Sequence, residues 1–297
     1  MFSGSLVAIV TPMRADGSLD FAAWLRLIDF HVENGTTGIV VGGTTGESAT
    51  LADAELAELA ERASRHLQGR IPVIAGCGGS STAAMVERVK RLSQLPVAAL
   101  LVTTPAYNRP TQEGLYRHFA AIAASSRLPM LLYNVPARTA VDMLPATVAR
   151  LAQLSRVIGI KEAVAQVARV RELLDACGPN FIVLSGDDAT ARETMLAGAH
   201  GVISVTANIV PGVMAELAAA AGKRDRVAAG RLDAPLAALH RDLFIESNPI
   251  PAKWLLARLG LIESGIRLPL TELATTYHAA VSASAQAAGV MFQVEYS

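Results

Sequence analysis

Residues 157–161 read Val-Ile-Gly-Ile-Lys, a short apolar run that ends in a lysine. β-Branched residues followed by a helical pattern predict a parallel strand that is covered on both faces. Because side chains alternate along a strand, Val157, Gly159 and Lys161 are expected on one face and the two isoleucines on the other. A lysine buried there has little water around its ammonium, which favours the neutral, nucleophilic amine. Taken alone, the run also fits a lysine that reaches solvent from a strand end.

Similar apolar runs recur along the chain at a fairly even spacing, and amphipathic helical patterns separate them. Eight such strand-and-helix units predict a (β/α)8 TIM barrel, an α/β fold. The alternative is a doubly wound sheet, which usually carries a glycine-rich phosphate turn after its first strand, where this chain has Thr11-Pro12-Met13. The eight runs begin near Leu6, Gly38, Pro72, Val97, Pro129, Val157, Phe181 and Gly201.

The chain divides into two predicted regions. After about Pro211 the strand pattern disappears, and Ala-rich and Leu-rich helical segments follow. We predict a catalytic barrel over residues 1–222 and an appended C-terminal helical region, packed on the barrel, over residues 223–297, because no flexible linker separates them. No role is predicted for the last few residues. Asp20 is expected to cap the first helix, and Thr50 to open a variant capping box for the second.

The composition limits the class of protein. The chain has 297 residues, 52% of them hydrophobic, with 26 basic and 26 acidic side chains and a formal net charge of zero. Zero net charge argues against a general nucleic-acid or acidic-membrane surface. No run approaches the roughly 20 apolar residues of a membrane helix, and the N-terminus lacks the basic start of a signal peptide. With Cys77 and Cys177 interpreted as reduced thiols, these features predict a soluble cytoplasmic protein that binds neither nucleic acid nor membrane.

Candidate catalytic residues gather at one predicted edge, because active residues of a (β/α)8 barrel lie at the C-terminal ends of its strands. The amine of Lys161 can attack a keto carbonyl to form an imine, whose protonated nitrogen acts as an electron sink. The Tyr133 hydroxyl can relay protons, and the run 42–47 offers backbone N–H groups and two hydroxyls for a carboxylate. Each feature alone also fits a structural role. The side chains predicted at this edge are Thr44, Thr45, Tyr133 and Lys161.

Arg138 follows the turn at Pro136 and can bind a second carboxylate bidentately, although a surface arginine is the default interpretation of a single instance. The six histidines form no ligand cluster by spacing, so a metal-dependent aldolase is disfavoured and no metal site is predicted. Gly-x-x-x-x-Gly-Lys-Ser/Thr is absent, so no nucleoside triphosphate site is evident. The residues therefore favour imine chemistry.

Five segments carry a combined pattern that is more specific than any of its parts. They are Gly43–Glu47 (GTTGE), Thr104–Pro110 (TPAYNRP), Tyr133–Thr139 (YNVPART), Gly159–Ala163 (GIKEA) and Leu184–Asp188 (LSGDD). Together they resemble the dihydrodipicolinate synthase family, and the similarity extends from Met1 to about Gly289. Single motifs are shared with the wider pyruvate-aldolase superfamily, but the ordered set is highly specific.

The resemblance implies an enzyme that condenses pyruvate with L-aspartate-4-semialdehyde to 4-hydroxy-tetrahydrodipicolinate, in lysine and diaminopimelate biosynthesis. It implies a homotetramer built from tight dimers. No cofactor is implied, because pyruvate forms a covalent imine on Lys161. By position, Tyr133 is the proton relay, and Thr44 lies between it and Tyr107, which is expected to reach in from the neighbouring subunit.

The resemblance assigns the substrate-binding residues in the same way. Thr45 would hold the pyruvate carboxylate, with Gly186 and the backbone of Ile203 lining the pocket. Arg138 would bind the carboxylate of the semialdehyde at the entrance.

Two alternatives stay open. N-acetylneuraminate lyase or a 2-keto-3-deoxy sugar-acid aldolase would share Lys161 and Tyr133, but those enzymes commonly have Ser-Thr where this chain has Thr44-Thr45. A catalytically idle paralogue that binds ligands belongs to a different class. It is disfavoured because the chemical positions are intact.

The residues that would bind a feedback inhibitor differ from the pattern of lysine-inhibited relatives. In those relatives an acidic residue, an amide, a histidine and a tyrosine commonly hold lysine at the subunit interface. Without them the ligand's charged ends lose the partners that compensate their desolvation, although Asp53 could offset part of the loss. We predict weak or absent inhibition by lysine. The matching positions carry Ala84, Ser80, Leu56 and Ala106, while Ser48 and Ala49 are retained.

Overall fold

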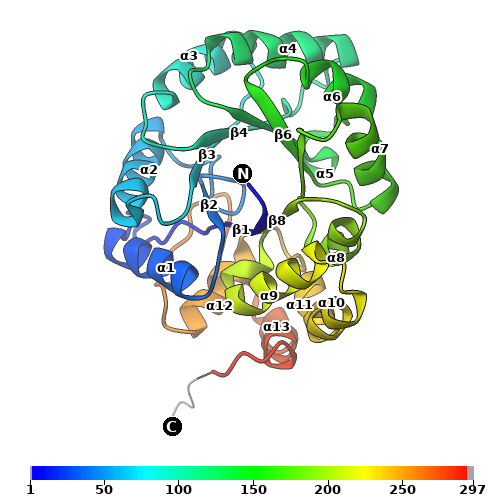
Figure 1. Cartoon of the computed structure of the whole chain (residues 1–297). Helices are drawn as coiled ribbons and strands as arrows, with labels where there is room; N and C mark the ends of the chain where they lie inside the picture. The colour runs from blue at the N-terminus through cyan, green and yellow to red at the C-terminus, as the bar shows by residue number, and fades with distance from the viewer. Residues whose placement is uncertain (1, 293–297) are drawn as a thin grey trace.

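Eight short parallel strands close into a barrel, and helices surround it (Figure 1). The computed structural model describes residues 2–292. Each strand pairs with the next and β1 pairs with β8, so the predicted (β/α)8 barrel is confirmed. The strands are Gly4–Ala8 (β1), Gly38–Val41 (β2), Val73–Cys77 (β3), Ala99–Thr103 (β4), Met130–Asn134 (β5), Val157–Glu162 (β6), Ile182–Ser185 (β7) and Gly201–Ser204 (β8).

The helices of the barrel are Phe21–Glu33 (α1), Asp53–Leu67 (α2), Thr82–Leu92 (α3), Gln112–Ser125 (α4), Pro136–Thr139 (α5), Pro145–Leu151 (α6), Val167–Cys177 (α7), Asp188–Leu196 (α8) and Pro211–Gly222 (α9). Helix α1 begins as predicted, with the Asp20 carboxylate accepting hydrogen bonds from two backbone N–H groups. The predicted cap of α2 was wrong. Thr50 belongs to the preceding turn, where its N–H donates to the oxygen of Glu47, and Ala52 caps the helix with its N–H bonded to the Glu55 carboxylate.

Apolar side chains pack in two layers. One layer lies between the strands and the helices, and the other fills the barrel itself. A filled interior is typical of this fold, which is a packed core and not a pore. Tyr133 and Val135 belong to the interior layer and also line the cavity at the mouth of the barrel, so the barrel core directly supports the candidate site.

Strand β6 carries a bulge at Ile158, where its pairing with β5 shifts by one residue. Ile158 packs towards the barrel interior and Val157 joins the outer layer, so the faces predicted for these two side chains were wrong. Beyond the bulge the alternation holds, and Lys161 lines the cavity as predicted. A Cβ on Gly159 would lie 2.4 Å from the backbone oxygen of Ile182, so only glycine fits at this close approach of two strands.

The C-terminal segments lie along one side of the barrel, next to α8 and α9 (Figure 1). The predicted C-terminal helices are present, and α10 packs on α9. The boundary between residues 222 and 223 stays a prediction. The helices are Arg226–Asp233 (α10), Ala237–Asp242 (α11), Ile250–Arg258 (α12) and Thr275–Ala287 (α13), with 3-10 turns at Thr206–Asn208 and Ala234–Leu236.

Several expectations concern features of the whole chain. Of the segment from Val290 to Ser297, for which no role is predicted, residues 293–297 lie outside the described part. Within residues 2–292, no helix is long and apolar enough to cross a membrane. Over the same residues, the structure brings together no group of three or more His, Cys, Asp or Glu side chains that could hold a metal ion.

Candidate active site

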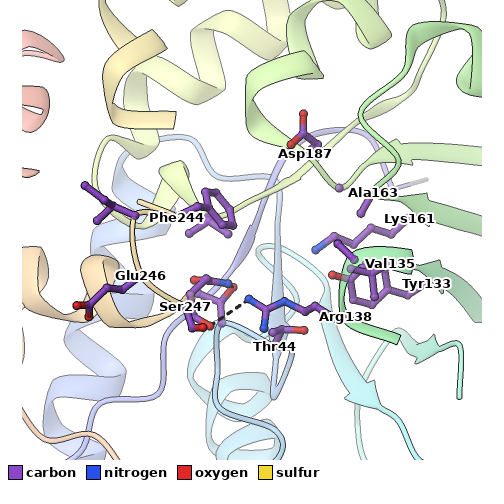
Figure 2. A pocket seen from close by; sticks show the side chains of 16 residues that line it. Thr44, Tyr133, Val135, Arg138, Lys161, Ala163, Asp187, Phe244, Glu246 and Ser247 are labelled. Atoms are coloured by element: carbon purple, nitrogen blue, oxygen red, sulfur yellow. Dashed lines mark hydrogen bonds between the residues drawn. The ribbon is translucent and has the colours of Figure 1, made fainter. Parts of the chain in front are cut away.

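A cavity of about 650 Å³ opens at the C-terminal ends of the strands (Figure 2). Its walls come from the loops after β2, β5, β6 and β7, and from residues 244–248 of the C-terminal region. This is the end of a (β/α)8 barrel where active sites occur. The predicted residues that line it are Thr44, Thr45, Tyr133, Arg138, Lys161 and Gly186.

Lys161 and Tyr133 form the base of the cavity, on adjacent strands and directly opposite each other in the register. The Nζ atom of Lys161 lies 4.5 Å from the centre of the Tyr133 ring, and both side chains point into the cavity (Figure 2). Lys161 is only 5% exposed. An amine therefore lies beside a phenol in a place with little water, which suits nucleophilic attack on a carbonyl with proton transfer close by.

Gly186 shapes the space beside that amine. A Cβ on residue 186 would lie 2.9 Å from Cε of Lys161 and 3.0 Å from the side chain of Ala163. Any larger residue would displace the lysine. The Gly186 N–H donates to the backbone oxygen of Glu162 at 2.7 Å, which ties the β7 loop to the end of β6.

The loop after β2 is a tight turn, and it offers fewer free donors than expected. The N–H groups of Gly46 and Glu47 donate to oxygens within the turn, so the predicted row of N–H groups for a carboxylate is shorter. Thr44 and Thr45 line the cavity, and Thr45 is buried. The Oγ1 atom of Thr45 accepts a hydrogen bond of 2.9 Å from the side-chain amide of Asn248.

Arg138 lies on α5, a single turn that begins at Pro136. Its guanidinium is exposed at the mouth of the cavity and donates to the backbone oxygen of Asn248 at 3.3 Å. A cation placed there can bind a carboxylate that enters from solvent.

Asn248 is a site residue that the sequence reasoning missed. It donates to Thr45 and accepts from Arg138, so it joins two walls of the cavity. Its own Oδ1 atom is buried and has no hydrogen-bond partner among residues 2–292. The only signal was the break in the helical pattern at residues 248–251, and no spacing rule connects that break to a threonine 203 positions earlier.

Two predicted residues do not reach the cavity of their own chain. Tyr107 lies on a loop, is 94% exposed and has a positive backbone φ. The side chain of Ile203 packs inside the barrel, which leaves the prediction for its backbone as it was. The role of Tyr107 in the neighbouring subunit stays a prediction.

Three of the positions that would bind lysine, Ser48, Ala49 and Ala106, line a smaller cavity of about 300 Å³, and Leu56, Ser80 and Ala84 do not line it. Leu56 is buried in the outer apolar layer. Asp53, the residue expected to compensate, is already paired with two cations. Its carboxylate oxygens lie 3.0 Å from Arg88 and 2.6 Å from Arg91.

The fold and this cavity define the class of protein, a (β/α)8 barrel with a buried lysine at the centre of its site. Residues 1–288 match the Dihydrodipicolinate synthetase family, and the chain belongs to that family.

Individual relatives agree along the whole chain. The 4-hydroxy-tetrahydrodipicolinate synthase of Methylococcus capsulatus is 51% identical, over 98% of this chain and 100% of the relative. A crystal structure of the chloride-inhibited dihydrodipicolinate synthase from Acinetobacter baumannii, complexed with pyruvate, is 47% identical with a TM-score of 0.96, over 98% of this chain and 100% of that one. A crystal structure of the dihydrodipicolinate synthase from Cyanidioschyzon merolae, with lysine bound, is 34% identical with a TM-score of 0.92, over 98% of this chain and 99% of that one.

Proposed function

We propose that this chain condenses pyruvate with L-aspartate-4-semialdehyde to 4-hydroxy-tetrahydrodipicolinate, a reaction of lysine and diaminopimelate biosynthesis. The observation that carries the proposal is the buried amine of Lys161, 4.5 Å from the centre of the Tyr133 ring at the base of an open cavity. An amine kept from bulk water and a neighbouring phenol are the groups that imine formation needs. No cofactor enters the reaction, because Lys161 itself supplies the covalent link.

The reaction begins when the amine attacks the ketone of pyruvate. The carbinolamine loses water, with proton transfer through Tyr133 and Thr44, and leaves an imine on Lys161. The protonated imine draws electrons, so the methyl group loses a proton and the resulting enamine carbon attacks the aldehyde of the second substrate. The semialdehyde's own amine then displaces Lys161 from the imine carbon, which closes the ring and frees the lysine.

Each substrate carboxylate has partners of its own. Thr45 holds the carboxylate of pyruvate, and Gly186 and the backbone of Ile203 line the pocket around it. Arg138 binds the carboxylate of the semialdehyde, and its exposed position at the mouth of the cavity supports this role.

Borohydride trapping tests the lysine chemistry. Wild-type protein mixed with pyruvate and borohydride gains an irreversible mass on Lys161, while Lys161→Ala gains none and loses several orders of magnitude in turnover. Lys161→Arg keeps a positive charge at this position, but its guanidinium stays protonated and cannot attack the ketone. This matched variant should therefore also lose trapping and turnover. Near-normal turnover or trapping in either variant would overturn the mechanism.

The second substrate is tested in an assay of pyruvate plus aspartate semialdehyde coupled to a downstream reductase. Sialic acid and keto-deoxy sugar acids run in parallel, and faster turnover of either would favour the sugar-acid aldolases. Arg138→Ala weakens use of the semialdehyde strongly, while trapping with pyruvate persists.

We also propose a homotetramer built from tight dimers, in which Tyr107 enters the neighbouring subunit's site. The support is that Tyr107 is exposed and does not line the cavity of its own chain. Mixed oligomers of Tyr107→Phe and Lys161→Ala chains then recover activity that neither parent has. Confirmed heteromers without recovery would show that each chain completes its own site.

Lysine inhibits this enzyme weakly or not at all. The pairing of Asp53 with Arg88 and Arg91 supports the proposal, because that carboxylate is not free to bind the ligand's ammonium. Initial rates over a lysine titration into the millimolar range decide the question, and strong inhibition at submillimolar lysine would contradict it.

The cytoplasm is the proposed location. Cys77 and Cys177 are both free thiols, as expected in a reducing compartment. Burial raises the pKa of each thiol to about 11, so neither is a ready nucleophile that competes with Lys161.

A further inference from the structure

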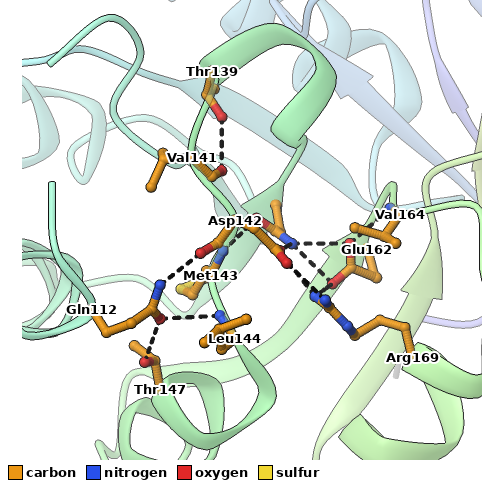
Figure 3. A network of polar contacts seen from close by, with 11 residues as sticks. Gln112, Thr139, Val141, Asp142, Met143, Leu144, Thr147, Glu162, Val164 and Arg169 are labelled. Carbon is orange, nitrogen blue, oxygen red and sulfur yellow. Dashed lines mark hydrogen bonds and ion pairs between the residues drawn. The ribbon is translucent and has the colours of Figure 1, made fainter. Parts of the chain in front are cut away.

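A buried polar cluster lies behind the two strand ends that carry Tyr133 and Lys161 (Figure 3). It consists of Asn134, Asp142, Glu162 and Arg169. We propose that Glu162 is a positioning residue, which fixes the ends of β5 and β6 so that the amine of Lys161 and the hydroxyl of Tyr133 keep their relative placement through the reaction. This inference rests on the proposed function, because it assigns a role only if Lys161 forms the imine.

The register places the cluster one residue beyond the reacting groups. Tyr133 pairs with Lys161, and Asn134 pairs with Glu162. Because side chains alternate along strands, the first pair faces the cavity and the second faces the helices. Asn134 and Glu162 are almost fully buried, at 0% and 1% exposure, so neither can touch substrate.

The carboxylate of Glu162 joins three segments. The side-chain amide of Asn134 donates to both of its oxygens, at 3.1 Å each, which links β6 to β5. The N–H of Val164 donates to Oε1 at 2.8 Å, which fixes the turn after β6. Arg169 on α7 lies 3.5 Å from Oε2.

Asp142 extends the cluster to the helix that bears Arg138. It follows α5 in the chain, accepts from the Asn134 amide at 2.7 Å, and receives two hydrogen bonds from Arg169 at 2.9 and 2.7 Å. The Oδ1 atom of Asn134 accepts the N–H of Met143 at 3.0 Å. The segment after α5 is thus held to the same strand ends as the amine and the phenol.

Burying this carboxylate costs free energy, which its partners offset only in part. Desolvation raises the pKa of Glu162 from 4.5 to about 7, against the opposing hydrogen bonds from Val164 and Asn134. An apolar residue would avoid the cost but could not hold an amide, a backbone N–H and a guanidinium together. The geometry therefore favours alignment of the strand ends as the reason for a carboxylate at this position.

Glu162→Gln tests the proposal, because the amide keeps the shape of the side chain but adds a donor among donors. A misplacement near 1 Å costs about 100-fold in rate. We expect kcat to fall by about 10-fold to 100-fold, with a similar fall in the rate of imine trapping and a much smaller change in KM for pyruvate. Rates are referred to folded protein, measured by circular dichroism.

Asp233→Asn is the matched control. It disturbs the ion pair of 3.2 Å between Asp233, at the end of α10, and Arg192 on the barrel helix α8, so it reports what a lost pair does away from the strand ends. Its kcat stays at the wild-type value. If Glu162→Gln does not fold, Asp142→Asn removes the partner of Arg169 at a half-buried position and shows the same split between kcat and KM at smaller size.

Two outcomes separate this inference from the proposed function. If wild-type protein is trapped by pyruvate and borohydride but Glu162→Gln, or its replacement Asp142→Asn, keeps wild-type kcat, Glu162 is structural only and the inference is wrong. If wild-type protein is not trapped at all, the imine mechanism itself fails.

Discussion

Glu47 and Glu162 are both buried carboxylates behind the mouth of the barrel, yet they are held in different ways. Glu47 pairs with the buried ammonium of Lys253, 206 positions further along the chain, and its other oxygen accepts the N–H of Arg267 at 3.1 Å. Glu162 is held mainly by an amide and a backbone N–H, with the nearest cation 3.5 Å away.

The difference shows two uses of a buried negative charge. The pair at Glu47 fastens the C-terminal region to the loop that carries Thr44 and Thr45. Desolvation lowers the pKa of Lys253, and the neighbouring Glu47 opposes that shift, so each charge depends on its partner. At Glu162 the compensation is incomplete, and the carboxyl pKa rises to about 7.

The largest expected effect comes from breaking the first arrangement. Lys253→Met leaves the Glu47 carboxylate buried without its cation, and we expect the free energy of unfolding to fall by about 3–5 kcal/mol. Urea unfolding at neutral pH measures it. The double variant Glu47→Gln/Lys253→Met removes both charges and should recover most of the loss. If the free energy of unfolding of the single variant falls by less than about 1 kcal/mol, the pair contributes no more than a surface salt bridge. The difference described between Glu47 and Glu162 would then be wrong.

The raised pKa of Glu162 predicts that the free energy of unfolding depends on pH. Because the folded pKa of Glu162 lies above its ordinary value of 4.5, the protonated carboxyl favours folding. That contribution is full below pH 4.5 and is lost as pH rises through about 7. The free energy of unfolding of wild type minus Glu162→Gln should therefore fall by about 3 kcal/mol over this range. Urea midpoints of both proteins across pH measure it, and a flat difference would contradict the raised pKa.

The smallest expected effect concerns Asn248, which precedes the helix that Lys253 anchors. Asn248→Ala removes one hydrogen bond to Thr45, with a net value of about 0.5–1.5 kcal/mol. KM for pyruvate should rise by roughly 2-fold to 10-fold, with kcat less affected. Asp233→Asn serves again as the control, because Asp233 does not line the cavity. An unchanged KM in Asn248→Ala would show that the C-terminal region braces the loop without tuning the site.

Local sequence patterns were enough to predict the barrel and the residues at its mouth. Apolar runs and helical stripes are set by neighbours in the chain, and Lys161 and Tyr133 stand at the ends of such runs. In a (β/α)8 barrel the C-terminal ends of all strands lie at the same end, so the proximity of Lys161 and Tyr133 could be predicted from the topology.

What the patterns missed depends on contacts between distant segments. The bulge at Ile158 arises from pairing with β5, and no signal in the run itself predicts an extra residue. The bonds of Glu47 with Lys253 and of Thr45 with Asn248 join parts of the chain about 200 positions apart. The cap of α2 was wrong because Thr50 stays in the turn that Glu47 begins, so that Glu55 reaches back to Ala52.

The long separation of Glu47 and Lys253 along the chain also means that Lys253 is synthesised well after Glu47. A ribosome adds about 5–20 residues per second, so the 206 positions between them take roughly 10–40 s to emerge. For most of that interval the barrel itself is incomplete, because β8 ends at Ser204, and only while residues 205–252 are added does the nascent chain have all its strands without the cation of Lys253. The loop after β2 therefore gains its anchor only after all eight strands have been made, and premature termination before residue 253 would release a barrel whose substrate loop has no anchor.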